Sequence, residues 1–220
     1  MDHSQKNTFL NSEGDQWFER NRLKISDYSE ANCRIFQAVK KLPSPPKRIL
    51  EIGCSNGIRL AHIQSHFGIE CTGIDPSSAA ISDGTKRFPN LNLHVGTADH
   101  LDFANATFDT IIFGFCLYLC DRNDLFKIVY EADRCLTDPG NLIIMDFYPS
   151  TPLRNEYAHK ENTFSYKMNY AGLFTANPAY TEISNSVFTS AEASIDDPNE
   201  RMAVNILRKN SVKAYPSWNS

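Results

Sequence analysis

Several features of membrane, secreted and nucleic-acid-binding proteins are missing from this 220-residue sequence. No apolar run approaches the roughly 20 residues that a membrane-spanning helix needs. The polar N-terminus has no signal-peptide core, so we expect a cytoplasmic protein. Lys and Arg number 22 against 26 Asp and Glu, which gives a net charge of −4. Because proteins that bind nucleic acid by displacing counterions usually carry a basic surplus, we expect neither a nucleic-acid nor a membrane partner.

The six cysteines are isolated from one another, with no CxxC pair. Several lie in apolar runs, where a small buried thiol fits, so we interpret them as reduced core residues. Cys116 and Cys120 are spaced like a pair of metal ligands, and so are His62 and His66. Neither pair has the further ligands that a metal site needs, so we predict no metal.

An alternation of short β-branched runs with amphipathic segments dominates residues 45–148. Strands are expected at 48–52, 71–74, 91–95, 110–115 and 142–146, and helices at 60–67, 78–88 and 124–136. Strands that alternate with helices form parallel βαβ units with right-handed crossovers. We therefore predict an α/β protein with a Rossmann-like open sheet, mostly parallel, with helices on both faces.

The flanking segments are expected to complete a single domain, 1–220. Residues 1–42 carry loose apolar stripes and predict an N-terminal helical cap over the cofactor-binding core at 45–148. Residues 149–180 are rich in proline and aromatic residues without clear periodicity, so we expect an irregular substrate lid. Two apolar runs within 181–210 predict a C-terminal antiparallel hairpin that closes the sheet.

A glycine-rich turn follows the first predicted strand. From Glu51 the chain passes through Gly53 and Cys54 to Gly57 and enters a helix at once. Gly53 lets a ligand approach the backbone, and the N–H groups of the first helical turn suit polar or anionic ligand atoms. A tight turn with no ligand is the alternative, so this segment alone is weak evidence for a nucleotide-type ligand.

Polar residues follow the next two strands. Asp75 lies 24 residues after Glu51 (75 − 51) and is placed to accept hydrogen bonds from both hydroxyls of a ribose. Pro76 and Ser77 follow it, so a role as helix N-cap is the alternative for Asp75. Residues 96–99 suit the edge of an adenine, or form only a polar turn. Because open α/β sheets bind ligands at the carboxyl ends of their strands, the joint spacing is more specific than any one piece.

Together these segments resemble the class I S-adenosylmethionine-dependent methyltransferases, over residues 45–150 and in the closing hairpin. The family's first motif has glycines spaced G-x-G-x-G, and Ser55 stands at the middle position here. The segment from Phe108 to Tyr118 is similar to the family's fourth motif, in which many members have a histidine where Tyr118 stands. The resemblance implies S-adenosyl-L-methionine as the cofactor and S-adenosyl-L-homocysteine as its product.

The resemblance also implies roles for single residues. Glu51 and Gly53 would lie near the methionine part of the cofactor, Asp75 on the ribose, and Ala98 with its neighbours on the adenine. The family often has an acidic residue where Thr97 stands, which leaves Asp99 as a candidate substitute. The residues expected to bind the cofactor are Trp17, Glu51, Gly53, Cys54, Gly57, Asp75, Pro76, Thr97, Ala98, Asp99, Gly114 and Phe115.

Methyl transfer from a sulfonium is an in-line displacement, which needs an aligned acceptor atom and often the removal of one proton. His159 suits the role of base near neutral pH, and Tyr118 and Tyr166 suit the orientation of the acceptor; these three are the catalytic candidates. The residues expected to bind substrate are Tyr118, Tyr157, His159, Tyr166, Lys167 and Tyr170. A solvent-exposed histidine and tyrosines that only anchor the lid or the core are the alternatives.

The leading hypothesis is methyl transfer to an oxygen or nitrogen of a small metabolite, by a monomer or homodimer. A methyltransferase of protein or tRNA is a second hypothesis, which the acidic balance and the absence of an N-P-P-Y motif after the fourth strand disfavour. A non-catalytic module that keeps the fold is a third. A NAD dehydrogenase needs G-x-G-x-x-G, a pattern that Ser55 and Ile58 break.

The segment from Gly14 to Asn21 resembles the start of small methyltransferases of bacterial polysaccharide or secondary-metabolite pathways, where it implies a helical cap over the cofactor. A plain aromatic core anchor at Trp17 and Phe18 is the alternative. We expect removal of residues 1–25 to weaken cofactor binding in a calorimetric titration. Unchanged affinity in the truncated protein would contradict the cap hypothesis.

Overall fold

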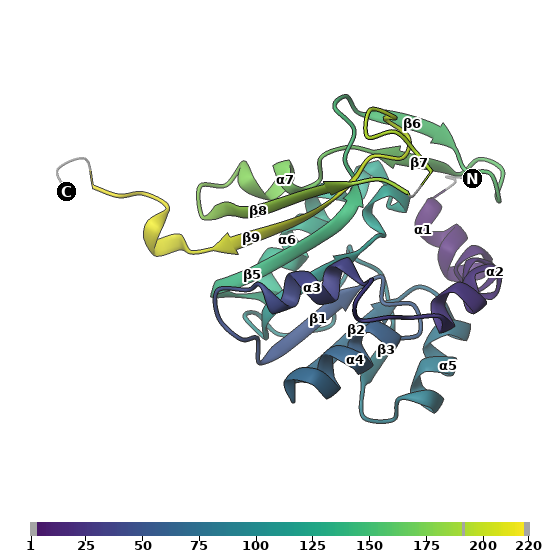
Figure 1. Ribbon diagram of the computed structural model, residues 1–220, viewed down its shortest axis with the longest axis horizontal. Helices are drawn as coiled ribbons and strands as arrows, with labels where there is room; N and C mark the ends of the chain where they lie inside the picture. The colour runs from purple at the N-terminus through teal and green to yellow at the C-terminus, as the bar shows by residue number, and fades with distance from the viewer. Residues whose placement is uncertain (1–3, 191, 218–220) are drawn as a thin grey trace.

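The computed structural model describes residues 4–190 and 192–217. Its centre is a seven-stranded sheet in the order β3-β2-β1-β4-β5-β9-β8 (Figure 1). The strands are β1 (Arg48–Ile52), β2 (Glu70–Asp75), β3 (Asn92–Val95), β4 (Phe108–Gly114), β5 (Leu136–Phe147), β8 (Tyr180–Phe188) and β9 (Met202–Lys209). The first five pair in parallel, and β9 runs antiparallel to both β5 and β8. This confirms the predicted mostly parallel α/β sheet and its C-terminal antiparallel hairpin.

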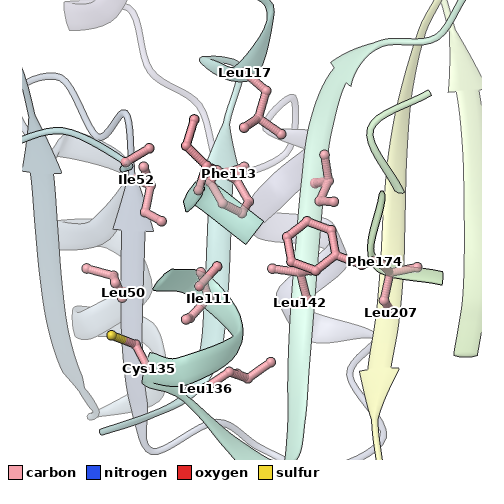
Figure 2. Packing of buried hydrophobic residues seen from close by; sticks show 14 of the residues in the cluster. Leu50, Ile52, Ile111, Phe113, Leu117, Cys135, Leu136, Leu142, Phe174 and Leu207 are labelled. Atoms are coloured by element: carbon pink, nitrogen blue, oxygen red, sulfur yellow. The ribbon is translucent and has the colours of Figure 1, made fainter. Parts of the chain in front are cut away.

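Helices cover both faces of this sheet. One face carries α3 (Arg34–Lys40), α4 (Ile58–Phe67) and α5 (Ser78–Arg87), and the other carries α6 (Leu125–Cys135) and α7 (Ala171–Thr175). Successive side chains of a strand point to opposite faces, so Ile112 packs in the α3–α4 cluster while Ile111 and Phe113 pack in the α6–α7 cluster. Figure 2 shows the second cluster, in which Phe174 of α7 lies beside Leu142 of β5. The prediction of helices on both faces is confirmed.

The N-terminal segment divides into two parts. An arm consists of α1 (Gln5–Thr8), a π-helical turn (Phe9–Glu13) and α2 (Gly14–Ser26), which follow one another without a break. This arm lies beside α5 and beside the small hairpin of β6 (Leu153–Glu156) and β7 (Phe164–Lys167) (Figure 1). The sequence had grouped α3 with the cap, but Ile35, Phe36 and Val39 of α3 are buried against the sheet. Within residues 1–42, the prediction of a cap over the cofactor therefore rests on the arm and not on α3.

The segment 149–180 is more regular than its composition indicates. It contains a two-stranded hairpin, β6 (Leu153–Glu156) with β7 (Phe164–Lys167), followed by α7. The expectation of irregular structure was therefore wrong, whereas the role of this segment as a substrate lid stays a prediction. Along β7 the side chains of Ser165 and Lys167 are buried and those of Phe164 and Tyr166 are half-buried, which is the two-residue period of a strand. This alternation is too short to stand out from the surrounding aromatic residues.

No helix among the described residues is long and apolar enough to cross a membrane.

A close approach between α5 and the glycine-rich turn depends on Gly84. A Cβ there would overlap the Asn56 carbonyl oxygen and lie 2.6 Å from Leu93 Cδ1. We expect Gly84→Ala to lower the free energy of unfolding by about 1–3 kcal/mol in urea titrations, because overpacking forces the backbone apart. The matched control is Gly172→Ala in α7, where the nearest atom to an added Cβ is 3.9 Å away. That variant should be neutral or slightly stabilising, since Ala favours helix. Equal effects of the two substitutions would contradict this account.

Candidate cofactor and substrate site

A cavity lies at the carboxyl ends of the parallel strands, and the N-terminal arm contributes part of its wall. Residues at or after the strand ends that line it are Ile52, Gly53, Ser55, Ile74, Asp75, Pro76, Gly96, Thr97, Ala98, Asp99, Gly114, Phe115, Cys116 and Tyr118. The arm contributes Lys6, Phe9, Gly14 and Trp17, and the segment that leads into α6 contributes Leu119, Cys120, Asp121, Asp124 and Ile128. The sequence singled out ten of these positions by number as site residues: Trp17, Gly53, Asp75, Pro76, Thr97, Ala98, Asp99, Gly114, Phe115 and Tyr118.

The glycine-rich turn has three residues with left-handed backbone. Gly53, Ser55 and Gly57 have φ values of 76°, 51° and 73°. A glycine would adopt this conformation freely, which gives a physical reason for the G-x-G-x-G spacing of the first motif. Ser55 adopts it at some cost, and its N–H is held by Asp75 Oδ2 at 2.8 Å. Gly53 is also sterically required, since a Cβ there would lie 2.6 Å from Cys116 Cβ.

Asp75 ties the turn to the end of β2. Its Oδ2 accepts from Ser55 N, and its Oδ1 accepts from Ser77 N at 2.9 Å. Each oxygen keeps a second lone pair for a ligand hydroxyl. The N-cap of α5 is Ser77, whose hydroxyl accepts from Ala80 N at 3.0 Å. Burial raises the pKa of Asp75 to about 6, against the lowering effect of the two N–H donors.

The cavity wall also contains an ion pair that the sequence did not indicate. Lys6 Nζ of the arm lies 2.7 Å from Asp99 Oδ2 and 3.2 Å from Asp124 Oδ2. Burial disfavours the charged form of Asp99, but its hydrogen bonds with Lys6 and Thr97 hold its pKa below the ordinary value. Asp99 therefore faces the predicted adenine position as a carboxylate. A lysine in a polar N-terminal stretch has no pattern around it that would mark it for this role.

Hydrogen bonds to three parts of the fold hold the arm in place. Asp121 accepts from the first N–H groups of α1, with Gln5 N at 3.0 Å and Lys6 N at 2.9 Å. The Gln5 side-chain amide pairs with the Phe164 backbone in both directions, at 2.8 and 3.1 Å. Asp15 of α2 accepts from Ala79 N at 2.9 Å, at the start of α5. The arm is thus fixed to the loop after β4, to β7 and to α5.

Three residues expected to bind the cofactor do not line the cavity. Glu51 is fully buried, and its Oε1 accepts from Arg59 Nε at 2.7 Å. Gly114 leaves room for this pair, because a Cβ there would lie 2.5 Å from Glu51 Oε1. Cys54 is buried beside Gly73, where an added Cβ would lie 2.6 Å from its sulfur. Gly57 is the N-cap of α4. All three residues belong to the turn or to the strand before it but lie outside the cavity wall. Their direct contact with the cofactor stays a prediction.

Most of the expected substrate residues are anchors in this structure. Tyr118 lines the cavity. Lys167 Nζ donates to Asn199 O at 2.6 Å, and Tyr157 OH donates to buried Glu13 at 3.0 Å. Tyr166 and Tyr170 both pack on the Arg122 guanidinium, which lies 4.5 and 5.6 Å from their ring centres. The His159 ring lies 5.4 Å from that of Tyr157, in the β6–β7 loop. These five residues are outside the cavity wall, so their roles in substrate binding or catalysis stay predictions.

Two thiols also belong to the wall. Cys116 Sγ donates to Ile52 O at 3.3 Å, and Cys120 Sγ donates to Cys116 O at 3.5 Å. Burial raises the pKa of both, in Cys120 to about 12. Across the described part of the chain, no three His, Cys, Asp or Glu residues are grouped so as to hold a metal ion.

The fold and the cavity define an α/β domain that binds a nucleoside-type cofactor at the carboxyl ends of its strands. Residues 49–140 match the model of a methyltransferase domain family. The uncharacterized methyltransferase YcgJ of Bacillus subtilis is 30% identical over 122 residues, which cover 52% of this chain and 47% of that protein. Demethylmenaquinone methyltransferase of Chlorobaculum parvum is 30% identical over 154 residues, which cover 66% of this chain and 61% of that protein.

A solved structure extends the likeness to most of the chain. It is 1,6-didemethyltoxoflavin-N1-methyltransferase of Burkholderia thailandensis, with bound 1,6-didemethyltoxoflavin and S-adenosylhomocysteine. The TM-score is 0.71 at 16% identity, over 93% of this chain and 88% of that one, which shows a shared fold. Residues 49–140 therefore form a methyltransferase domain, and the chain has the fold of the class I S-adenosylmethionine-dependent methyltransferases. It spans about half to three fifths of the length of the curated relatives named above.

The cofactor of this family is S-adenosyl-L-methionine, and the cavity fits it. Asp75 presents lone pairs to a ribose, and the backbone of Gly53 and Gly114 lines the cavity at the strand ends. Thr97, Ala98, Asp99 and Ile128 all line the cavity, so that an adenine bound beside them would have both polar and apolar contacts.

Cofactor affinity should depend on pH through Asp75. The ionised carboxylate accepts two hydroxyl hydrogen bonds, whereas the protonated form loses part of this capacity. With a pKa of about 6, the dissociation constant of S-adenosylhomocysteine should be flat above pH 7 and rise as pH falls, by on the order of tenfold at pH 5. Asp99 does not titrate in this window, because its pKa is lowered. In Asp75→Asn the affinity should be lower and this pH dependence lost; a variant that keeps the wild-type profile would assign it to another group.

Proposed function

We propose that this chain transfers the methyl group of S-adenosyl-L-methionine to an oxygen or nitrogen of a small molecule. The observation that carries the proposal is the cavity at the carboxyl ends of β1, β2 and β4, which Asp75, the glycine-rich turn and the N-terminal arm all line. The acceptor must reach the cofactor within this cavity.

The position of the arm favours a small acceptor. Phe9 and Trp17 of the arm line the same cavity as the strand ends. Lys6 of the arm forms an ion pair with Asp99, which also lines this cavity. A residue within a folded protein or a tRNA would have to displace these side chains. The net charge of −4 also lacks the basic surplus that a polynucleotide substrate favours. Both features support a small molecule over a macromolecule.

The chemistry that the cofactor supplies when bound is an electrophilic methyl group on sulfur. The chain's own contribution is the alignment of the acceptor atom and the exclusion of water, which together account for a large part of such rate enhancements. Among the described residues no histidine lines the cavity, and Asp75, Asp99 and Asp121 already accept hydrogen bonds from the protein. This arrangement favours catalysis by positioning, with an acceptor that is itself a good nucleophile.

The test is calorimetric titration of the purified chain with S-adenosylmethionine, S-adenosylhomocysteine and NAD. We expect micromolar binding of the two sulfur compounds and none of NAD, with at least a tenfold loss in Asp75→Ala, because the ribose loses two charge-assisted hydrogen bonds. The matched control is Asp102→Ala, an exposed aspartate outside the cavity, which should bind as wild type does.

Binding of NAD in preference to the sulfur compounds would overturn the proposal. Binding of the sulfur compounds justifies a screen of small phenols, amines and heterocycles for methylated product by mass spectrometry. Product from a protein or tRNA mixture and from no small molecule would support the macromolecular alternative. Cofactor binding without turnover of any acceptor would support the non-catalytic module.

A further inference from the structure

We propose that the acceptor is a planar, π-conjugated molecule that stacks on Phe115 and Tyr118 and forms a hydrogen bond with the Tyr118 hydroxyl. This inference rests on the proposed function and names the substrate class of the same cavity. It comes from four features: aromatic lining, a strained backbone, a carboxylate that holds the aromatic residues, and a hydroxyl without a partner.

Aromatic side chains from two distant segments line the cavity. Phe9 and Trp17 come from the N-terminal arm, and Phe115 and Tyr118 follow β4. The rings of Phe115, Tyr118 and Phe147 lie 5.0–5.1 Å from one another, tilted by 49–82°. Such a cluster presents ring faces and edges, which attract other aromatic systems beyond the gain from buried area alone. A flat conjugated molecule makes the largest contact with these surfaces.

The backbone of Phe115 is strained. Its φ of 68° is unusual for a bulky side chain, and its N–H is fixed by Met145 O at 2.9 Å. Strained residues persist where the surrounding structure holds them, and they cluster at ligand sites. The conformation carries the chain out of β4 so that Phe115 lines the cavity. A residue with ordinary backbone would continue the strand.

Asp146, at the end of β5, holds the aromatic residues in position. Its buried carboxylate accepts from Leu117 N at 2.9 Å, Tyr118 N at 3.3 Å and Phe147 N at 2.8 Å. One side chain thus fixes the backbone on both sides of the ring cluster. Lys167 packs on Phe147, with its Nζ 3.9 Å from the centre of the Phe147 ring. The cluster is therefore rigid before any substrate arrives, which lowers the entropic cost of binding a rigid planar ligand.

The Tyr118 hydroxyl is the polar atom that this cluster leaves available. It has no hydrogen-bond partner among residues 4–190 and 192–217, and it is not one of the buried, unsatisfied atoms. Burial of the side chain and nearby Asp146 raise the pKa of Tyr118, so the phenol stays neutral and can donate or accept. A ring hydroxyl, carbonyl or nitrogen of the acceptor suits it.

The experiment uses the full chain saturated with S-adenosylhomocysteine and titrated with 2-naphthol. The comparison probe is decahydro-2-naphthol, which has the same skeleton and hydroxyl but is not planar. We expect the planar probe to bind at least about tenfold more tightly. Tyr118→Phe, which keeps the ring, should weaken 2-naphthol about fivefold, and Tyr118→Leu should weaken it more than tenfold.

Tyr130 on α6 supplies matched controls, because its side chain is exposed and outside the cavity. Tyr130→Phe and Tyr130→Leu should leave 2-naphthol binding unchanged. Equal affinity for the two probes, no binding of 2-naphthol to the loaded protein, or a loss in Tyr118→Leu no larger than in Tyr130→Leu would each overturn the inference while the proposed function stands. Failure of S-adenosylhomocysteine itself to bind would overturn both.

Discussion

At the carboxyl edge of the sheet, the peptide N–H groups of the turns need hydrogen-bond acceptors, and aspartate side chains supply them. Asp75 accepts from the glycine-rich turn and from the start of α5, and Asp146 accepts from the loop after β4 and from the end of β5. Asp15 and Asp121 do the same for the contacts of the N-terminal arm. Buried N–H groups are costly when unpaired, so the shape of this edge follows from where these carboxylates stand. The cavity is the space that they leave between the turns.

The parts of the fold that sequence patterns predicted are those that repeat a simple period. The β-branched runs and the helices between them place Gly53, Asp75 and Thr97 at one edge of a sheet, because parallel strands all end there. The same reasoning carries Phe115 and Tyr118 to the cavity, since they directly follow β4. Position after a strand was thus enough to bring these residues together.

The parts that sequence patterns missed depend on side-chain pairing between distant or unpatterned residues. Nothing in the sequence shows that Arg59 would occupy the carboxylate of Glu51, or that Lys6 would reach Asp99. Tyr166 and Tyr170 were expected to bind substrate because they lie in a long aromatic-rich segment without clear periodicity. In the structure they pack on Arg122 and lie outside the cavity wall, and a role in substrate binding stays a prediction. Composition alone does not distinguish aromatic residues that line a cavity from those that pack on neighbouring side chains.

The two cysteines in the cavity wall have a chemical consequence for a protein with this cofactor. A sulfonium is an alkylating agent, and a thiolate is among the best nucleophiles that a protein offers, whereas a thiol is poor. Burial raises the pKa of Cys120 to about 12 and that of Cys116 well above its ordinary value. For Cys120 at pH 7 only on the order of one molecule in 100,000 carries the thiolate. The same desolvation of the cavity wall therefore keeps both thiols poor nucleophiles toward a sulfonium bound in the cavity.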